Sequence, residues 1–184
     1  MKINIHEVIT IPQGVTATIE GTMVTIKGKK DEVCKKLGNP IVRIKTEPNT
    51  ITIDCEKATR TEKAQAYAII AHLNNMFKGV QEPYKYKLKI CSGHFPMNCA
   101  VTNNQMTIKN FLGEKVPRVI KLKKGVSVKI DGAHVLVESA DKELAGQTAA
   151  DIEQVTRIKG KDLRVFQDGI YIIEKASKPL EGIA

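Results

Sequence analysis

The segment MVTIKG at residues 23–28 recurs as MTIKN at residues 106–110 in a chain of 184 residues. The shared Thr-Ile-Lys triplets lie about 82 positions apart, and Gln65 matches Gln147 at the same spacing. Predicted turns and helix caps also coincide between the two halves, with Thr59 opposite Asp141. Self-similarity at a fixed spacing indicates repeated structural units, so we predict an internal duplication.

The first copy is predicted to be a set of antiparallel strands closed by one helix. Apolar residues alternate over 15–19 and 24–26, and two further strands are expected at 41–45 and 50–55. Thr59 and Glu62 have the form of a capping box, which predicts a helix start. The apolar face of this helix comprises Ala66, Ile70, Leu73 and Phe77, and Gly79 is expected to end it.

The second copy repeats this plan. Strands are predicted over 84–90, 98–101, 106–109, 126–130 and 135–138, followed by a helix over 141–157 that buries Leu144, Thr148, Ile152 and Val155. We therefore predict an α+β fold, two tandem copies of a small antiparallel sheet covered by one helix. The expected domains are 1–80 and 81–184, the second ending in a basic hairpin.

The composition favours a polyanionic partner. Lys and Arg number 29 against 20 Asp and Glu, a formal net charge of +9. Aromatic residues make up only 4% of the chain, which disfavours a module that stacks single-stranded bases on rings. The longest apolar run is too short to span a bilayer, and no signal-peptide features are present. We expect a soluble, cytoplasmic protein with no membrane partner and four free cysteines.

Two segments of the second copy concentrate the positive charge. Residues 109–129 hold seven basic residues and one acid, and the region after the predicted helix holds a second group. Basic side chains with few rings beside them suit recognition of the backbone and shape of folded RNA, and DNA is not expected. A solvated surface that only maintains solubility is the alternative. The predicted RNA contacts are Lys109, Lys115, Arg118, Lys121, Lys123, Lys124, Arg157, Lys159, Lys161, Arg164 and Lys175.

The second basic group belongs to the stretch QVTRIKGKDLRVFQDGIYIIEK at residues 154–175. Asp168-Gly169 separates the basic residues from an apolar β run that begins at Ile170, and Asp-Gly between two such runs is a strong hairpin signal. We therefore predict a hairpin that presents positive charge. Phe166 and Tyr171 are expected to pack within it and not to stack on bases.

Other kinds of site have little support. Cys91, His94 and Cys99 could form part of a zinc site, but a closed structural site needs four ligands and no fourth stands at a ligand spacing. Lys27 to Lys30 lack the P-loop spacing. Because no nucleophile and base stand together in a recognisable pattern, we expect no enzyme activity, no metal and no cofactor.

The chain resembles the L-six family of large-subunit ribosomal proteins, in the archaeal and eukaryotic branch whose eukaryotic counterpart carries the number nine. The likeness covers essentially the whole chain. It is carried by Gly93 to Met97, by Asn110 to Lys115, and by a C-terminal signature made of Gln154, Arg157, Ile158, Lys161, Arg164, Phe166, Asp168, Gly169, Ile170, Tyr171 and Lys175. Bacterial members end in a different motif, Tyr-Lys-Gly-Lys-Gly, which is absent here, so contacts mapped on that motif do not transfer.

This resemblance implies a structural, non-catalytic constituent of the large ribosomal subunit. It would bind large-subunit rRNA mainly through the second domain, beside the sarcin-ricin region where translational GTPases dock, with other ribosomal proteins as neighbours. A free RNA-binding regulator or chaperone outside the ribosome is the alternative, because both share a basic surface. The sequence leaves open whether the first copy touches rRNA.

Overall fold

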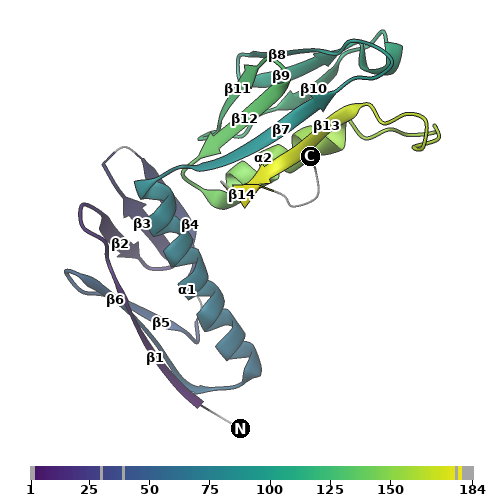
Figure 1. Ribbon diagram of the computed structural model, residues 1–184. Helices are drawn as coiled ribbons and strands as arrows, with labels where there is room; N and C mark the ends of the chain where they lie inside the picture. Colours follow the sequence, from purple (N-terminus) through teal and green to yellow (C-terminus); the bar gives the residue numbers. More distant parts are fainter. Residues whose placement is uncertain (1–2, 30, 39, 177, 180–184) are drawn as a thin grey trace. The chain divides into compact units, whose positions relative to one another are not determined.

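The computed structural model describes residues 3–29, 31–38, 40–176 and 178–179. The chain divides into two compact units, Met1–Pro83 and Tyr84–Ala184, each containing antiparallel sheets and one long helix (Figure 1). The strand pairings are antiparallel throughout the described residues.

In the part of the first unit that the structure describes, the strands form two three-stranded sheets. One has the order β1-β6-β5, with β1 at Ile3–Thr10, β5 at Arg43–Thr46 and β6 at Thr50–Ala58. The other has the order β2-β3-β4, with β2 at Thr16–Glu20, β3 at Met23–Lys27 and β4 at Glu32–Lys36. The predicted strands are present, whereas β4 was not predicted because its sequence EVCKK contains only two apolar residues.

Helix α1, Arg60–Gln81, completes the first unit. The predicted capping box is present, since the backbone N–H of Thr59 donates to Oε2 of Glu62 at 2.7 Å. The prediction that Gly79 ends the helix is wrong: the buried face continues to Val80, which is 5% exposed. Packing of this last turn outweighs the cost of about 1 kcal/mol for a glycine inside a helix.

The second unit has the same plan with additions. The sheet β10-β9-β8 consists of Arg118–Lys121, Gln105–Lys109 and Asn98–Thr102. The larger sheet has the order β11-β12-β7-β13-β14. Its strands are β7 at Tyr84–Cys91, β11 at Ser127–Asp131, β12 at His134–Ser139, β13 at Gly169–Lys175 and β14 at Lys178–Pro179.

Strand pairing confirms the duplication. The order β1-β6-β5 matches β7-β12-β11, and β2-β3-β4 matches β8-β9-β10. The registers agree as well: Ile5 lies opposite Cys55 in the first unit, and Tyr86 lies opposite Val137 in the second. Within the described residues, each copy is therefore an α+β unit of six strands and one α-helix, to which the second copy adds β13 and β14.

Helix α2, Lys142–Val155, covers β12, β7 and β13. Its N-cap Asp141 accepts the backbone N–H of Glu143 at 2.9 Å. Thr148 and Ile152 are buried as predicted, whereas Leu144 and Val155 are only half-buried and Ala145 and Ala149 take their place. Small residues on this face let the helix lie close to the sheet, where Leu88, Val135 and Ile170 are fully buried.

The predicted C-terminal hairpin is wrong. Strand β13 pairs with β7, with Ile170 opposite Ile90, and the basic residues lie in the loop between α2 and β13 (Figure 1). The Asp-Gly pair does not form a hairpin turn, and both residues are instead packed against their neighbours. A Cβ on Gly169 would lie 3.0 Å from the ring of Tyr171, and Asp168 is buried at 2% exposure.

Candidate nucleic-acid interface

Residues 156–168, here called the basic loop, connect α2 to β13 and carry four of the predicted RNA contacts. Thr156 holds the first end of the loop. Its hydroxyl donates to the carbonyl of Glu153 at 3.0 Å and accepts the backbone N–H of Ile170 at 3.0 Å. Thr156 is 3% exposed, so these bonds lie in the core beneath the loop.

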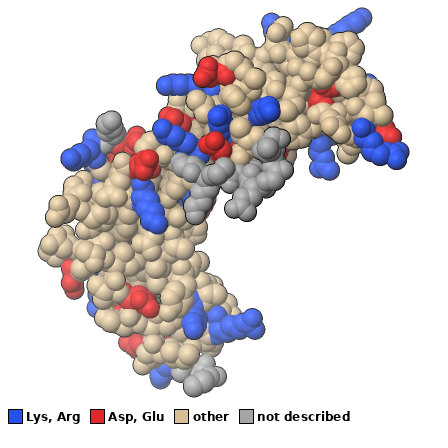
Figure 2. Space-filling model, in the orientation of Figure 1, with Lys and Arg blue, Asp and Glu red and all other residues tan. Residues whose placement is uncertain are grey.

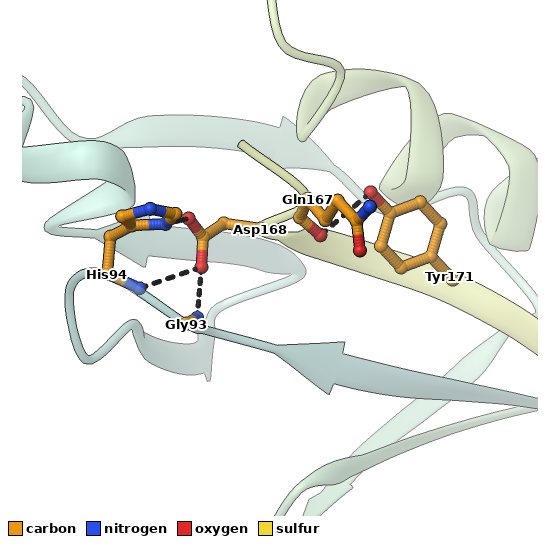
Figure 3. A network of polar contacts seen from close by, with 5 residues as sticks. All are labelled: Gly93, His94, Gln167, Asp168 and Tyr171. Carbon is orange, nitrogen blue, oxygen red and sulfur yellow. Dashed lines mark hydrogen bonds and ion pairs between the residues drawn. The ribbon is translucent and has the colours of Figure 1, made fainter. Parts of the chain in front are cut away.

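Asp168 holds the other end of the basic loop (Figure 3). Its Oδ1 accepts the backbone N–H groups of Gly93 and His94, the latter at 3.2 Å. Its Oδ2 lies 2.7 Å from Nδ1 of His94. Three protein groups therefore converge on one buried carboxylate, and they tie the end of the loop to residues 93–94, just beyond β7.

The pKa of Asp168 reflects two opposing influences. Burial acts to raise the pKa, but the hydrogen bonds from Gly93 and from the ring and backbone of His94 outweigh it, so the net pKa is lowered. The carboxylate is thus held in its charged, accepting form. An ionised acceptor makes stronger hydrogen bonds than a neutral one, which suits an anchor for a loop.

A tilted pair of aromatic rings supports the same end of the loop. The ring centroids of His94 and Phe166 are 4.8 Å apart, and Nζ of Lys161 lies 4.7 Å from the centroid of Phe166. The hydroxyl of Tyr171 donates to the carbonyl of Gln167 at 3.1 Å. Both aromatic residues therefore make contacts within the protein, and that they do not stack on bases stays a prediction.

The basic side chains of the loop project outward. Arg157, Lys159, Lys161 and Arg164 are all exposed. Arg164 is paired with Asp162, through an Nη2–Oδ2 distance of 3.0 Å, but its side chain remains 91% exposed. An exposed ion pair of this kind is worth little in water, so a phosphate can compete for the guanidinium.

Arg118 has a different environment from the other predicted contacts. Its guanidinium makes a bidentate pair with Glu114 and donates to the carbonyls of Val155 and Arg157. It also lies over the ring of Phe111, 4.1 Å from the centroid. These contacts take up four of its five N–H donors and join the segment before β10 to the C-terminal end of α2, so the structure favours a supporting role over phosphate binding.

The remaining predicted contacts are only partly gathered. A pocket of about 560 Å³ lies between β10 and the end of α2, with Arg157 and Lys159 in its lining. Lys161 is near enough to help lower the pKa of Glu114, after the larger effect of the Arg118 hydrogen bond, so the basic loop adjoins residues 111–117. That segment includes the exposed Lys115.

Other predicted contacts lie further away. Lys123 faces α2, with Nζ 3.9 Å from Oδ2 of Asp151. Lys175 is at the opposite end of β13 from the basic loop, a span of about 20 Å for seven residues. On the visible face of the second unit, Lys and Arg side chains lie in separate groups, with Asp and Glu side chains among them (Figure 2).

Among the described residues, neither a metal site nor a membrane-spanning helix is found. No group of His, Cys, Asp and Glu among them could hold a metal ion, and Cys99 does not join His94 in such a group. No helix in this part of the chain is long and apolar enough to cross a membrane. The four cysteines are free thiols.

Comparison with known proteins decides the family. The family model described as ribosomal protein L6 matches residues 11–83 and 95–169, one range in each unit. The chain belongs to the ribosomal protein L6 family. Two archaeal members named large ribosomal subunit protein uL6 are similar over nearly their whole length. The Methanococcus vannielii protein is 43% identical over 176 residues, 96% of this chain and 97% of its own. The Sulfurisphaera tokodaii protein is 44% identical over 174 residues, 94% of both chains.

Membership of the L6 family confirms the resemblance seen in the sequence and the duplicated α+β fold. It also confirms that the chain is not an enzyme, because the family consists of ribosomal structural proteins. Sequence reasoning missed the pairing of Asp168 with His94. Both residues stand in motifs of the family signature, but nothing in the spacing of positions 94 and 168 signals their contact.

Proposed function

We propose that this chain is a structural constituent of the large ribosomal subunit and binds large-subunit rRNA through its second unit, with the basic loop as the principal contact. The observation that carries the proposal is the anchoring of this loop at both ends, by Thr156 and by Asp168, while Arg157, Lys159, Lys161 and Arg164 remain exposed. A fixed loop binds with less loss of conformational entropy than a flexible one.

The chemistry of this loop suits phosphates better than bases. Lys and Arg neutralise phosphates, and the two rings in and beside the loop, Phe166 and Tyr171, make contacts within the protein. Recognition would therefore depend on the shape and backbone of folded rRNA. The names of the archaeal relatives support the ribosomal setting. The place beside the sarcin-ricin region, close to translational GTPases, rests on the family resemblance and belongs to the same proposal.

The test is a salt titration of binding to large-subunit rRNA. Simultaneous replacement of Arg157, Lys159, Lys161 and Arg164 by Ala should weaken binding and reduce the slope of log affinity against log salt by about 3 to 4, the value for four lost phosphate contacts. The matched control removes four exposed lysines of the first unit, Lys27, Lys29, Lys36 and Lys45, and should change the slope less. Equal slopes for the two variants would reject the basic loop as the contact.

Sedimentation tests the ribosomal setting separately. The chain should co-sediment with large subunits at about one copy per subunit in high salt. Binding to isolated rRNA without stable association with subunits would favour the free regulator or chaperone.

A further inference from the structure

Strand β1 forms an open edge in the first unit. In the sheet β1-β6-β5, one side of β1 pairs with β6, and no other described strand pairs with its second side (Figure 1). The backbone N–H of Ile11 donates to the carbonyl of Asn49, on the β6 side. Because pairing alternates along an antiparallel strand, the N–H and C=O groups of His6, Val8 and Thr10 face the open edge. All three residues are exposed.

The second unit shows what occupies the equivalent edge. By the matched registers, Val8 and Thr10 correspond to Lys89 and Cys91 of β7. In the second unit those two residues pair with Tyr171 and Gly169 of β13. The copy that has β13 therefore uses this edge to bind an antiparallel strand, whereas no described strand pairs with the same edge of the first copy.

The open edge carries only part of the protection that soluble proteins usually give to such strands, namely a register shift between Ile3 and Ile5 and the charged Glu7. Natural edges are also blunted by lysine, by proline or by short length. Strand β1 has eight residues, INIHEVIT, with neither lysine nor proline, whereas the covered β7 has three lysines. Ile3 and Val8 are 46% and 54% exposed, so apolar side chains also flank the edge.

Glu7 determines which kind of side chain an added strand would need at this edge. Glu7 stands where the second unit has Leu88, which is fully buried beneath its neighbours. The carboxylate of Glu7 accepts the hydroxyl of Tyr67 on α1 at 3.1 Å and has lone pairs left for a further donor. A basic side chain on an added strand would meet Glu7 at the place where β13 puts Ile172 against Leu88.

We propose that the open edge of β1 binds an extended segment of a partner protein, antiparallel to β1, with a Lys or Arg facing Glu7. Main-chain hydrogen bonds would supply the binding, and the Glu7 contact would select the partner. This site is separate from the basic loop and adds a protein-binding surface to the first unit. A second copy of the chain is a poorer occupant, because joining two β1 edges puts two Glu7 carboxylates on one face of the shared sheet.

The test uses the full chain and a synthetic peptide with blocked ends, GIYKIEK, which is the β13 sequence with Ile172→Lys. On saturation with peptide, the amides of His6, Val8 and Thr10 should exchange with solvent at least about tenfold more slowly in NMR hydrogen-exchange measurements. A matched peptide with Tyr171→Pro lacks the N–H that would pair with Val8 and should not protect these amides. Absence of protection at millimolar peptide, or protection at a different strand, would overturn the proposal.

A charge exchange tests the role of Glu7. The Glu7→Lys variant should bind GIYKIEK about threefold more weakly, and a peptide with Ile172→Glu should recover the affinity. If Glu7→Lys does not fold, Glu7→Gln removes the charge with little change in shape. Equal binding of both peptides by every variant would reject Glu7 as the selecting residue.

A second experiment, photocrosslinking in large subunits, rests on the proposed function. A photoreactive residue at Val8, in chains assembled into large subunits, should crosslink to a ribosomal protein, whereas crosslinks to rRNA alone would overturn the proposal. Failure of the chain to enter subunits would count against the proposed function. The peptide experiment would still decide whether the edge of β1 binds an added strand.

Discussion

Oδ2 of Asp168 lies 2.7 Å from Nδ1 of His94, although the two residues are 74 positions apart in the chain. This contact, together with the backbone N–H groups of Gly93 and His94, ties the basic loop to the end of β7. Removing the carboxylate should therefore affect both the stability of the second unit and the ability of the loop to bind RNA.

The Asp168→Ala variant is expected to lose about 2 kcal/mol of stability, because two backbone donors lose a buried acceptor. The melting temperature of the second unit should fall by about 10 °C in calorimetry. Asp162→Ala removes an exposed carboxylate of the same loop and should change the melting temperature little. A similar loss in both variants would contradict the anchoring role of Asp168.

The lowered pKa of Asp168 predicts a dependence of stability on pH. A carboxyl group with a lower pKa in the folded state contributes stability that is fully present above its unfolded pKa of about 3.9 and is lost as pH falls through the folded value. Urea midpoints of the wild type should therefore drop on acidification below about pH 4. The Asp168→Asn variant should have a lower urea midpoint at neutral pH, and its midpoint should fall less on acidification. If the midpoints of variant and wild type run parallel across the pH range, the prediction is wrong.

Arg118→Lys is expected to reduce stability without reducing the salt dependence of RNA binding. Lysine keeps the charge but cannot make the bidentate contact with Glu114 while donating to the carbonyls of Val155 and Arg157. The expected loss is about 1 to 2 kcal/mol in chemical denaturation. Arg118→Ala should lower stability further and still leave the salt slope near that of wild type. A slope reduced by about one for Arg118→Ala would instead identify a phosphate contact.

Distance from the basic loop should separate Lys161, which lies in the loop, from Lys175 at the far end of β13. Lys161→Ala removes a charge from the anchored loop and should reduce the salt slope of rRNA binding by about 0.9. Lys175→Ala removes the same charge at the other end of the strand and should leave the slope nearly unchanged. Filter-binding titrations compare the two variants at equal net charge. Equal salt slopes would show that the rRNA interface reaches the far end of β13.

Local sequence signals predicted much of the fold. The box formed by Thr59 and Glu62 is made within one turn of helix, so its pattern is complete in the sequence. Alternation over 15–19 and 24–26 likewise predicted β2 and β3. Because the sequence repeats, the strands and helix of the second copy could be predicted from those of the first.

The errors arose where contacts distant in sequence determine the structure. Asp168-Gly169 has the local form of a hairpin turn, but the partner of β13 is β7, about 80 residues earlier. Strand β10 is short and half polar, and only its pairing with β9 defines it. Charge predicted the basic loop as a candidate site, yet it could not separate the exposed Lys161 from Arg118, whose donors are engaged by Glu114 and two carbonyls.

The pairing of β13 with β7 also sets an order for folding during synthesis. The first unit makes its strand and helix contacts within residues up to 83, so it can fold once α1 has left the ribosome that makes it. The second unit needs Ile170 and Ile172 in its core, opposite Ile90 and Leu88. One edge of β7 therefore stays uncovered while some 80 further residues are made, and the basic loop takes its anchored form only after the strand that follows it has been synthesised.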